Sequence, residues 1–135
     1  MLRVSSEVYD AAIDHAREGA PAEVCGVLGG ERGATSHART LHRADNVATT
    51  PRTEYRIDPT EQLALMEALE ANGEEVVGFY HSHPHGPAEP SPTDRRRATW
   101  TDRSYVIIVL DGSHPYVGSW RWTGEAFERE AVALV

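Results

Sequence analysis

The sequence predicts an α/β (α+β) fold, a mixed β-sheet flanked by helices. Its 135 residues are the length of one compact domain. Helical and strand patterns alternate along the chain, which is typical of layered α/β and α+β proteins. No repeat, low-complexity tract or linker interrupts this order. We therefore expect residues 1–135 to form a single domain.

Residues 5–18 predict the first helix. Ser5 or Ser6 suits the N-cap position, and Gly19 follows as a stop signal. The residues that recur at helical spacing, and that we expect to face the core, are Val8, Ala12, Ile13 and Ala16.

Strand signals follow this helix. Residues 24–28 are a short apolar run that ends at Gly29-Gly30 and predicts a buried strand. A weaker signal covers residues 36–43. The alternation in residues 54–57 indicates an edge strand.

A second helix should begin at Asp58, as N-cap, with Pro59 at the first helical position. Asn72-Gly73 ends it. We expect its apolar side to consist of Leu63, Met66, Ala68 and Leu69.

The C-terminal half predicts a central strand at residues 75–82 and a short third helix at residues 92–101. Three more strands follow, at residues 104–110, 116–122 and 127–134. The turns between these strands should lie at Asp111-Gly112 and at Thr123-Gly124-Glu125.

Composition limits the classes of partner. The formal net charge of -8 argues against sequence-independent nucleic-acid binding, which needs a basic surface. The longest apolar stretch is far short of the roughly 20 residues that span a bilayer, so we expect no membrane partner. The single cysteine, Cys25, forms no internal disulfide and suits a reducing, cytoplasmic location.

All 13 basic residues are arginine, and the chain has no lysine. Two explanations remain open. A GC-rich coding composition favours arginine over lysine, and an acidic, lysine-free surface is compatible with a salt-adapted organism. Alternatively, a chain without side-chain amines cannot become the isopeptide-linked target of a modifier.

The stretch with the most chemical information contains His81, His83 and Asp94. Residues two apart in a strand point to the same face, so both imidazoles should share one face at the sheet's edge, before Pro84 ends the strand. Asp94 falls in the first turn of the third helix, for which Ser91 is a good N-cap. Two histidines and one carboxylate with a vacant position are typical of a catalytic zinc site.

Each half of this pattern also has a simpler interpretation. A His-x-His pair is common in exposed strands and loops, and Ser-Pro-Thr-Asp is also an ordinary helix start. Together they favour a metal site, because the seven residues between His83 and Ser91 can fold the helix start back toward the histidines. Glu23, beside the apolar strand, is either a general base or a carboxylate exposed at a strand end.

The combination resembles the signature of the JAMM (MPN+, Mov34/PAD-1) metalloprotease family. The matching residues are an upstream Glu23, His81-Ser82-His83-Pro84, Ser91 and Asp94. The resemblance implies a single MPN/JAB1 domain with a cytidine-deaminase-like architecture. It implies one zinc ion per chain bound by His81, His83 and Asp94, with Glu23 as general base and Ser91 as the residue that stabilises the oxyanion.

Within this family, the chain resembles the compact prokaryotic members, and in particular the archaeal desampylases. The resemblance thus implies cleavage of ubiquitin-like small archaeal modifier proteins from target lysines after a C-terminal Gly-Gly. Alternatives are a hydrolase acting on a sulfur-carrier protein–amino acid adduct and a non-catalytic MPN scaffold. A zinc nucleobase deaminase would need a Pro-Cys-x-x-Cys pair, which is absent. The oligomeric state stays open.

Several residues outside this signature have two interpretations. Cys25 is a core residue or a nucleophile, and Arg95-Arg96-Arg97 is a solvated helix face or a contact for an acidic modifier. Trp120 and Trp122 are strand packing or a binding platform, and Tyr80 is ambiguous in the same way, although we expect it to point away from His81 toward the core. We expect His85 in a loop near the substrate, and surface positions for the remaining histidines, which are His15, His37, His42 and His114.

Substrate binding should include strand addition by an extended Gly-Gly tail. We expect the free edge for it just before the loop that neighbours His81, or along residues 54–57.

Overall fold

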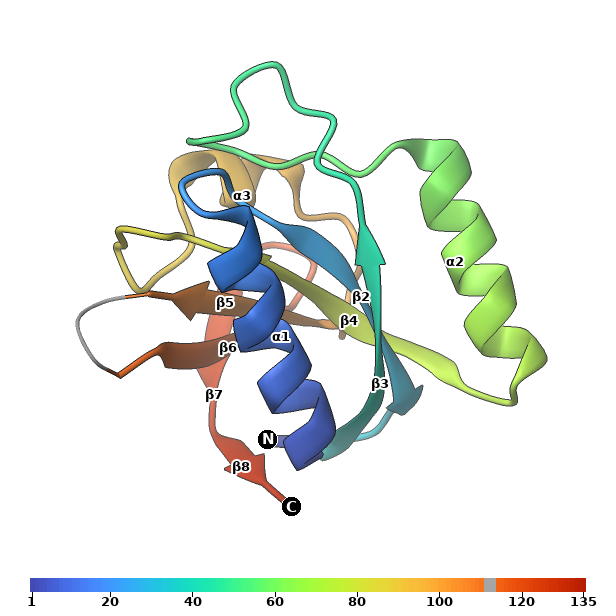
Figure 1. Ribbon diagram of the computed structural model, residues 1–135. Coiled ribbons are helices and arrows are strands. Elements are labelled where there is room, and N and C mark those ends of the chain that lie inside the picture. The colour runs from blue at the N-terminus through green and yellow to red at the C-terminus, as the bar shows by residue number, and fades with distance from the viewer. Residues whose placement is uncertain (111–113) are drawn as a thin grey trace.

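One mixed sheet of eight strands organises the molecule in the computed structural model, which describes residues 1–110 and 114–135 (Figure 1). The strands are β1 (Leu2–Val4), β2 (Cys25–Glu31), β3 (Ser36–Ala44), β4 (Glu75–Ser82), β5 (Ser104–Val109), β6 (Tyr116–Trp122), β7 (Phe127–Glu130) and β8 (Val132–Leu134). The helices are α1 (Ser6–Gly19), α2 (Pro59–Ala71) and α3 (Pro92–Arg97).

The strand order, β7-β6-β5-β4-β2-β3-β1-β8, places β4 at the centre of the sheet. β4 pairs antiparallel with β2 and parallel with β5, so the sheet is mixed, as predicted. β7 and β8 end the order on opposite sides, yet only Ala131 separates them along the chain. The sheet therefore curls until its two outer strands approach each other, and Figure 1 shows β8 continuing directly from β7.

The two longer helices cover opposite faces of the sheet. α1 buries the four predicted residues, Val8, Ala12, Ile13 and Ala16, in a cluster that includes Leu28 of β2 and Tyr80 of β4. α2 packs through Leu69 against Val27 of β2 and Phe79 of β4. The side chains of β2 alternate between these two clusters, which is the geometry of a strand covered on both sides.

The predicted apolar side of α2 is wrong in two positions. Leu63 is 56% exposed and Ala68 is exposed as well, whereas Leu69 is buried and Leu65 and Met66 are partly buried. Residues 62, 65, 66 and 69 follow the helical repeat that faces the sheet. The N-cap prediction is confirmed, since the Asp58 carboxylate accepts hydrogen bonds from the amides of Thr60 and Glu61.

Several predicted boundaries also change. β2 continues through Gly29-Gly30 to Glu31, with a register shift between the two glycines in its pairing with β3. The predicted strand at 127–134 is two strands, and β1, only three residues long, was not predicted. The turn after Trp122 is confirmed by a hydrogen bond from the Thr123 amide to the Ala126 carbonyl. The predicted turn at Asp111-Gly112 lies outside the described residues.

The third helix is shorter than predicted, ending at Arg97 rather than at residue 101. Ala98 adopts an extended conformation, and the chain then turns so that the Trp100 ring packs on Phe79, with 5.7 Å between ring centroids. The Trp100 amide donates to the Tyr105 hydroxyl at 3.2 Å. Tertiary contacts of the aromatic residues therefore end this helix.

Residues 54–57 form no strand. They belong to a loop held by Asn46, whose side-chain amide donates to the carbonyl oxygens of Glu23 and Glu54 at 2.9 and 3.0 Å. This loop lies between β3 and α2, on the same end of the sheet as α3 (Figure 1). Among the described residues, no helix combines the length and hydrophobicity needed to span a membrane.

Candidate metal centre

The end of β4 places His81 and His83. The sheet continues past the last strand residue, because the Ser82 amide donates to the Val24 carbonyl at 3.1 Å and the His83 amide to the Ile108 carbonyl at 2.8 Å. The histidines thus lie at the edge formed by strand ends, not along an outermost strand. They are only 1% and 4% exposed, so packing holds both rings in place.

Three ligand-type atoms converge here. The Nε2 atoms of His81 and His83 are 3.0 Å apart, and the Asp94 Oδ2 lies 3.1 and 3.2 Å from them. Ligands about 2.05 Å from a tetrahedral zinc ion would be about 3.3 Å from one another. Two imidazoles and a carboxylate also form a donor set that zinc prefers. The three residues therefore fit a single bound ion.

The surroundings orient the histidine rings. The His83 Nδ1 donates to the Pro87 carbonyl at 2.9 Å, which leaves its Nε2 lone pair for a metal. The Tyr55 ring stacks on His81, with 4.4 Å between centroids and 25° between planes. The His81 Nδ1 is buried, and within the described part of the chain it has no hydrogen-bond partner.

The first turn of α3 holds Asp94 through a reciprocal capping box. The Ser91 amide donates to the Asp94 Oδ2 at 2.9 Å, and the Asp94 amide donates to the Ser91 Oγ at 3.0 Å. Burial acts to raise the pKa of Asp94, but hydrogen bonds from His81 and His83 outweigh it and hold the pKa well below its usual value. The carboxylate is thus ionised, as a metal ligand must be.

Glu23 enters the same cluster from the segment just before β2. One of its carboxylate oxygens and a ring nitrogen of each of His81 and His83 all lie within 4.8 Å of one another. The residue is 6% exposed, and burial raises the pKa of its carboxyl to about 7. A carboxyl group with such a pKa can accept and return a proton near neutral pH.

Two cavities flank the four residues. The first, about 220 Å³, lies on the Glu23 side and is also lined by His83, His85 and Ser91. The second, about 240 Å³, lies on the Asp94 side, and its walls include aromatic rings. These rings belong to Tyr55, Phe79, Trp100 and Tyr105. The cluster therefore lies between two spaces into which the two parts of a substrate can extend.

The structure brings together all five residues of the sequence signature: Glu23, His81, His83, Ser91 and Asp94. Tyr55 and the Pro87 carbonyl were not predicted. Tyr55 lies within residues 54–57, for which the sequence predicts an edge strand. No sequence pattern indicates which backbone carbonyl will contact a histidine.

The other candidates lie elsewhere. Cys25 is fully buried in the cluster under α2, where burial raises the pKa of its thiol to about 12, so it is a core residue. Trp120 and Trp122 are buried within the sheet's packing, which rules out an exposed platform. Tyr80 is buried as predicted, but His15 is half-buried and binds its hydroxyl at 2.7 Å, so His15 is not a simple surface residue.

The predicted free edge for strand addition is wrong. β4 is paired on both sides, and residues 54–57 form no strand.

Comparison with known proteins places the chain in a family. The family described as prokaryotic homologs of the JAB domain matches residues 5–123. A desampylase from Haloferax volcanii is 44% identical over 98% of this chain and 96% of the relative. A CysO-cysteine peptidase from Mycobacterium tuberculosis is 35% identical over 100% of this chain and 92% of the relative.

A solved JAB1/MPN domain protein from Archaeoglobus fulgidus shares the fold, with a TM-score of 0.63 at 17% identity, over 100% of this chain and 97% of that one. The JAMM (MPN+) resemblance and the mixed sheet flanked by helices are thereby confirmed. The chain belongs to the family of prokaryotic homologs of the JAB domain.

Proposed function

We propose that this protein is a zinc-dependent isopeptidase that cleaves ubiquitin-like small modifier proteins from target lysines after the modifier's C-terminal Gly-Gly. The observation that carries the proposal is the convergence of His81, His83 and Asp94 within 3.0–3.2 Å, next to the buried carboxyl of Glu23. The full-length similarity to a protein named desampylase supports the choice of substrate.

The geometry of the site supports the following roles. One zinc ion per chain, bound by His81, His83 and Asp94, would polarise the scissile carbonyl and lower the pKa of a water molecule. Glu23 accepts the proton of that water and returns it to the leaving lysine amine, a task that suits its pKa of about 7.

Ser91 donates its hydroxyl hydrogen to the carbonyl oxygen as negative charge develops there. The cap bond does not prevent this, because in that bond the Ser91 oxygen is the acceptor, from the Asp94 amide. The same oxygen can thus accept in the capping box while its hydrogen points to the substrate.

The burial of the site favours an isopeptide bond as the substrate. His81 and Glu23 are 1% and 6% exposed, so only a substrate segment without bulky side chains can reach them. Gly-Gly has no side chains, and a lysine side chain is unbranched. The partners would then be ubiquitin-like modifiers and their conjugates, in the cytoplasm, where the single cysteine suits a reducing environment.

A second candidate is hydrolysis of a sulfur-carrier protein–amino acid adduct, favoured by the 35% identity to a CysO-cysteine peptidase. The same zinc ligands and base would serve it, so only the leaving amine distinguishes the two activities. The complete set of ligand, base and donor residues argues against a non-catalytic scaffold.

Cleavage by the purified protein tests both candidates. One substrate joins a Gly-Gly modifier to a lysine side chain, and the other joins it to a single cysteine. We expect the lysine conjugate to be cut after the terminal glycine, with loss of cleavage in a zinc chelator and recovery on adding zinc. Glu23→Gln should lower kcat about 10²–10⁴-fold.

The control for this variant is Glu67→Gln, which removes the same charge from an exposed position of α2. Mass spectrometry of the products locates the cut bond. Cleavage of the cysteine adduct alone would favour the second candidate, and cleavage of neither substrate by the zinc-loaded protein would refute both.

A further inference from the structure

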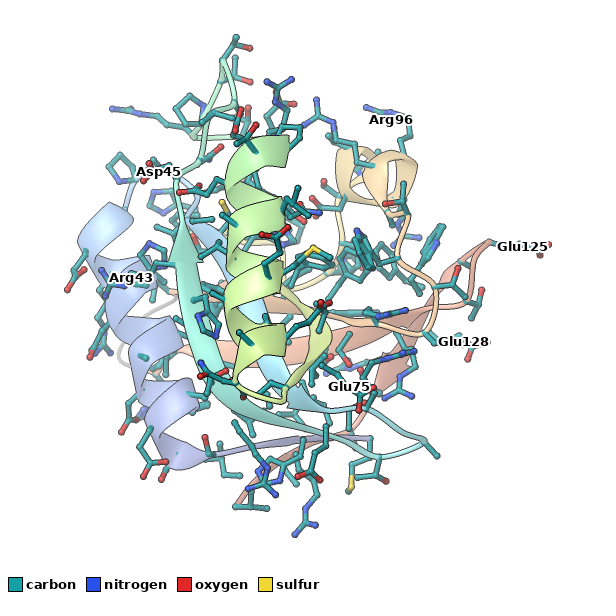
Figure 2. All side chains as sticks on the ribbon, turned by 90° about the vertical axis from the view of Figure 1, so that its right-hand side faces the viewer. Arg43, Asp45, Glu75, Arg96, Glu125 and Glu128 are labelled. Carbon is teal, nitrogen blue, oxygen red and sulfur yellow. The ribbon has the colours of Figure 1, made fainter. Side chains whose placement is uncertain are left out.

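The charges of this acidic protein are unevenly distributed. Residues 52–58 and 89–97, on both sides of the metal centre, hold five of the 13 arginines but only four of the 21 acidic residues. The five are Arg52, Arg56, Arg95, Arg96 and Arg97, and all are exposed. In Figure 2, Arg96 extends from α3 at the top of the view, while Glu75, Glu125 and Glu128 lie lower.

Most of these arginine charges are not neutralised by their neighbours. Arg97 pairs with Glu54 at 3.6 Å and donates to the Tyr55 carbonyl at 3.3 Å. Arg56, Arg95 and Arg96 form no ion pair among the described residues. Two of the four acidic groups are engaged elsewhere, since Asp58 caps α2 and Asp94 contacts both histidines. The exposed Glu89 forms no ion pair among the described residues.

The chemistry of the proposed reaction decides which part of the substrate lies near these arginines. Glu23 must return a proton to the leaving amine, so the target lysine extends into the cavity on the Glu23 side. The acyl part, which is the modifier's tail, then extends toward the cavity beside Asp94. That cavity is lined by Arg56 and Arg97 in addition to its aromatic walls, and Arg95 and Arg96 follow Asp94 on α3.

We propose that Arg56, Arg95 and Arg96 form a docking surface for an acidic face of the modifier, next to its C-terminal tail. The inference rests on the proposed isopeptidase function. Every conjugate contains the same modifier, whereas the target protein varies. A fixed charged surface can therefore bind all conjugates only if it binds the modifier. The acidic remainder of the enzyme repels such a partner and so directs its approach to the arginines.

The test compares two substrates with the same scissile bond. The first joins an acidic ubiquitin-fold modifier, through its terminal glycine, to a lysine in a short peptide. The second replaces the modifier by its last four residues only. The variant Arg95→Gln/Arg96→Gln removes two charges from the docking surface, and Arg56→Gln removes one.

The control variant is Arg3→Gln/Arg39→Gln, which removes two exposed arginine charges from β1 and β3 at the other end of the sheet. We expect the α3 variant to lower kcat/KM about 5- to 20-fold more for the protein conjugate than for the tail peptide at low salt. The loss of kcat/KM on the protein conjugate should exceed the loss on the tail peptide by less than about twofold near 1 M salt, where charges are screened. The control variant should keep the wild-type ratio of kcat/KM between the protein conjugate and the tail peptide.

A third arm replaces the acidic residues of the modifier by their amides, after which the α3 variant and the wild type should cleave the conjugate at similar rates. If the α3 variant loses kcat/KM equally on both substrates, or on neither, the proposed docking surface is overturned. The isopeptidase function would remain intact in both cases. Failure of the wild-type enzyme on both substrates would instead refute the proposed function, and the docking surface with it.

Discussion

Ser91 illustrates how one side chain can have a structural and a chemical task. Its oxygen accepts the Asp94 amide at 3.0 Å, while its backbone amide holds the Asp94 carboxylate at 2.9 Å. Ser91 also lines the cavity on the Glu23 side. The residue therefore positions the proposed metal ligand, and under the proposed mechanism its hydroxyl hydrogen is directed to the substrate.

Replacing Ser91 should separate these tasks. Ser91→Ala removes the proposed oxyanion donor and the cap, so we expect kcat to fall about 100- to 1,000-fold and stability by about 1 kcal/mol. Ser91→Asp keeps a capping acceptor without a donor at neutral pH, so it should restore stability but not kcat. Recovery of activity in Ser91→Asp would contradict a hydrogen-donating role. Steady-state kinetics and thermal unfolding provide the two measurements.

Glu23 has an energetic cost in the metal-free protein. The residue is 6% exposed, and burial raises the pKa of its carboxyl from an ordinary 4.5 to about 7. Between these values the folded protein keeps a proton that the unfolded chain has released. The stability of the metal-free protein therefore falls as pH rises from about 4.5 to about 7, and the loss remains at higher pH.

Glu23→Gln should remove this pH-dependent loss. At pH 8 we expect the metal-free variant to be more stable than the metal-free wild type by at most about 3 kcal/mol, the free energy equivalent of that pKa change. Near pH 4.5 the two should differ little. Urea unfolding of both proteins at the two pH values measures the effect, and an equal difference at both would contradict a buried, titrating carboxyl.

Among the elements, β4 determines where the histidines lie, and close packing of its backbone is necessary for this. Gly78 faces β5 so closely that a Cβ atom there would be 1.8 Å from the Ser104 carbonyl oxygen. The same pairing of β4 with β5 continues to His81, opposite Ile107. A side chain at residue 78 would therefore separate the two strands three residues before the first histidine.

Gly78→Ala should for this reason destabilise the fold by more than about 2 kcal/mol, because the backbone cannot move aside cheaply. We also expect weaker zinc binding in whatever fraction still folds. Gly73→Ala is an informative control, since no atom beyond its chain neighbours lies within 4 Å of its Cβ position and only the strain of its φ of 77° remains. Chemical denaturation measures the free energy of unfolding of each variant. A decrease below about 1 kcal/mol in Gly78→Ala would contradict the steric argument.

At the scale of the whole molecule, the metal centre connects the paired strands β2 and β4 to α3, a short helix outside the sheet. Glu23 precedes β2, the histidines end β4, and Asp94 is in α3, which buries none of its own residues. A metal ion bound by His81, His83 and Asp94 would attach α3 to the sheet. Binding to the folded state alone would also stabilise that state.

Zinc removal should therefore loosen α3 more than the sheet. We expect faster amide hydrogen exchange in residues 92–97 after chelation, little change in β4, and a lower unfolding temperature. Asp94→Asn should show the same exchange with and without zinc. Uniformly faster exchange across the sheet would indicate that the metal supports the whole fold instead of one helix.

Prediction from sequence succeeded where the signal is local. The spacing of the α1 core residues, the Asp58-Pro59 helix start and the exact span of β4 follow from periodicity and capping within a few neighbouring residues. The family signature depends on the order of side-chain types along the chain, so it could also be recognised from the sequence. Zinc ligands, base and oxyanion donor were all proposed from it.

Contacts between distant segments decided the rest. Burial of Glu23 and its pKa near 7 depend on packing against residues about 60 positions away. The stacking of Tyr55 on His81, the packing of Trp100 on Phe79 just after α3 ends, and the pairing of β1 with β8 likewise join segments far apart in sequence. Side-chain periodicity within one segment carries no information on which distant segment covers it, so these features follow only from the tertiary structure.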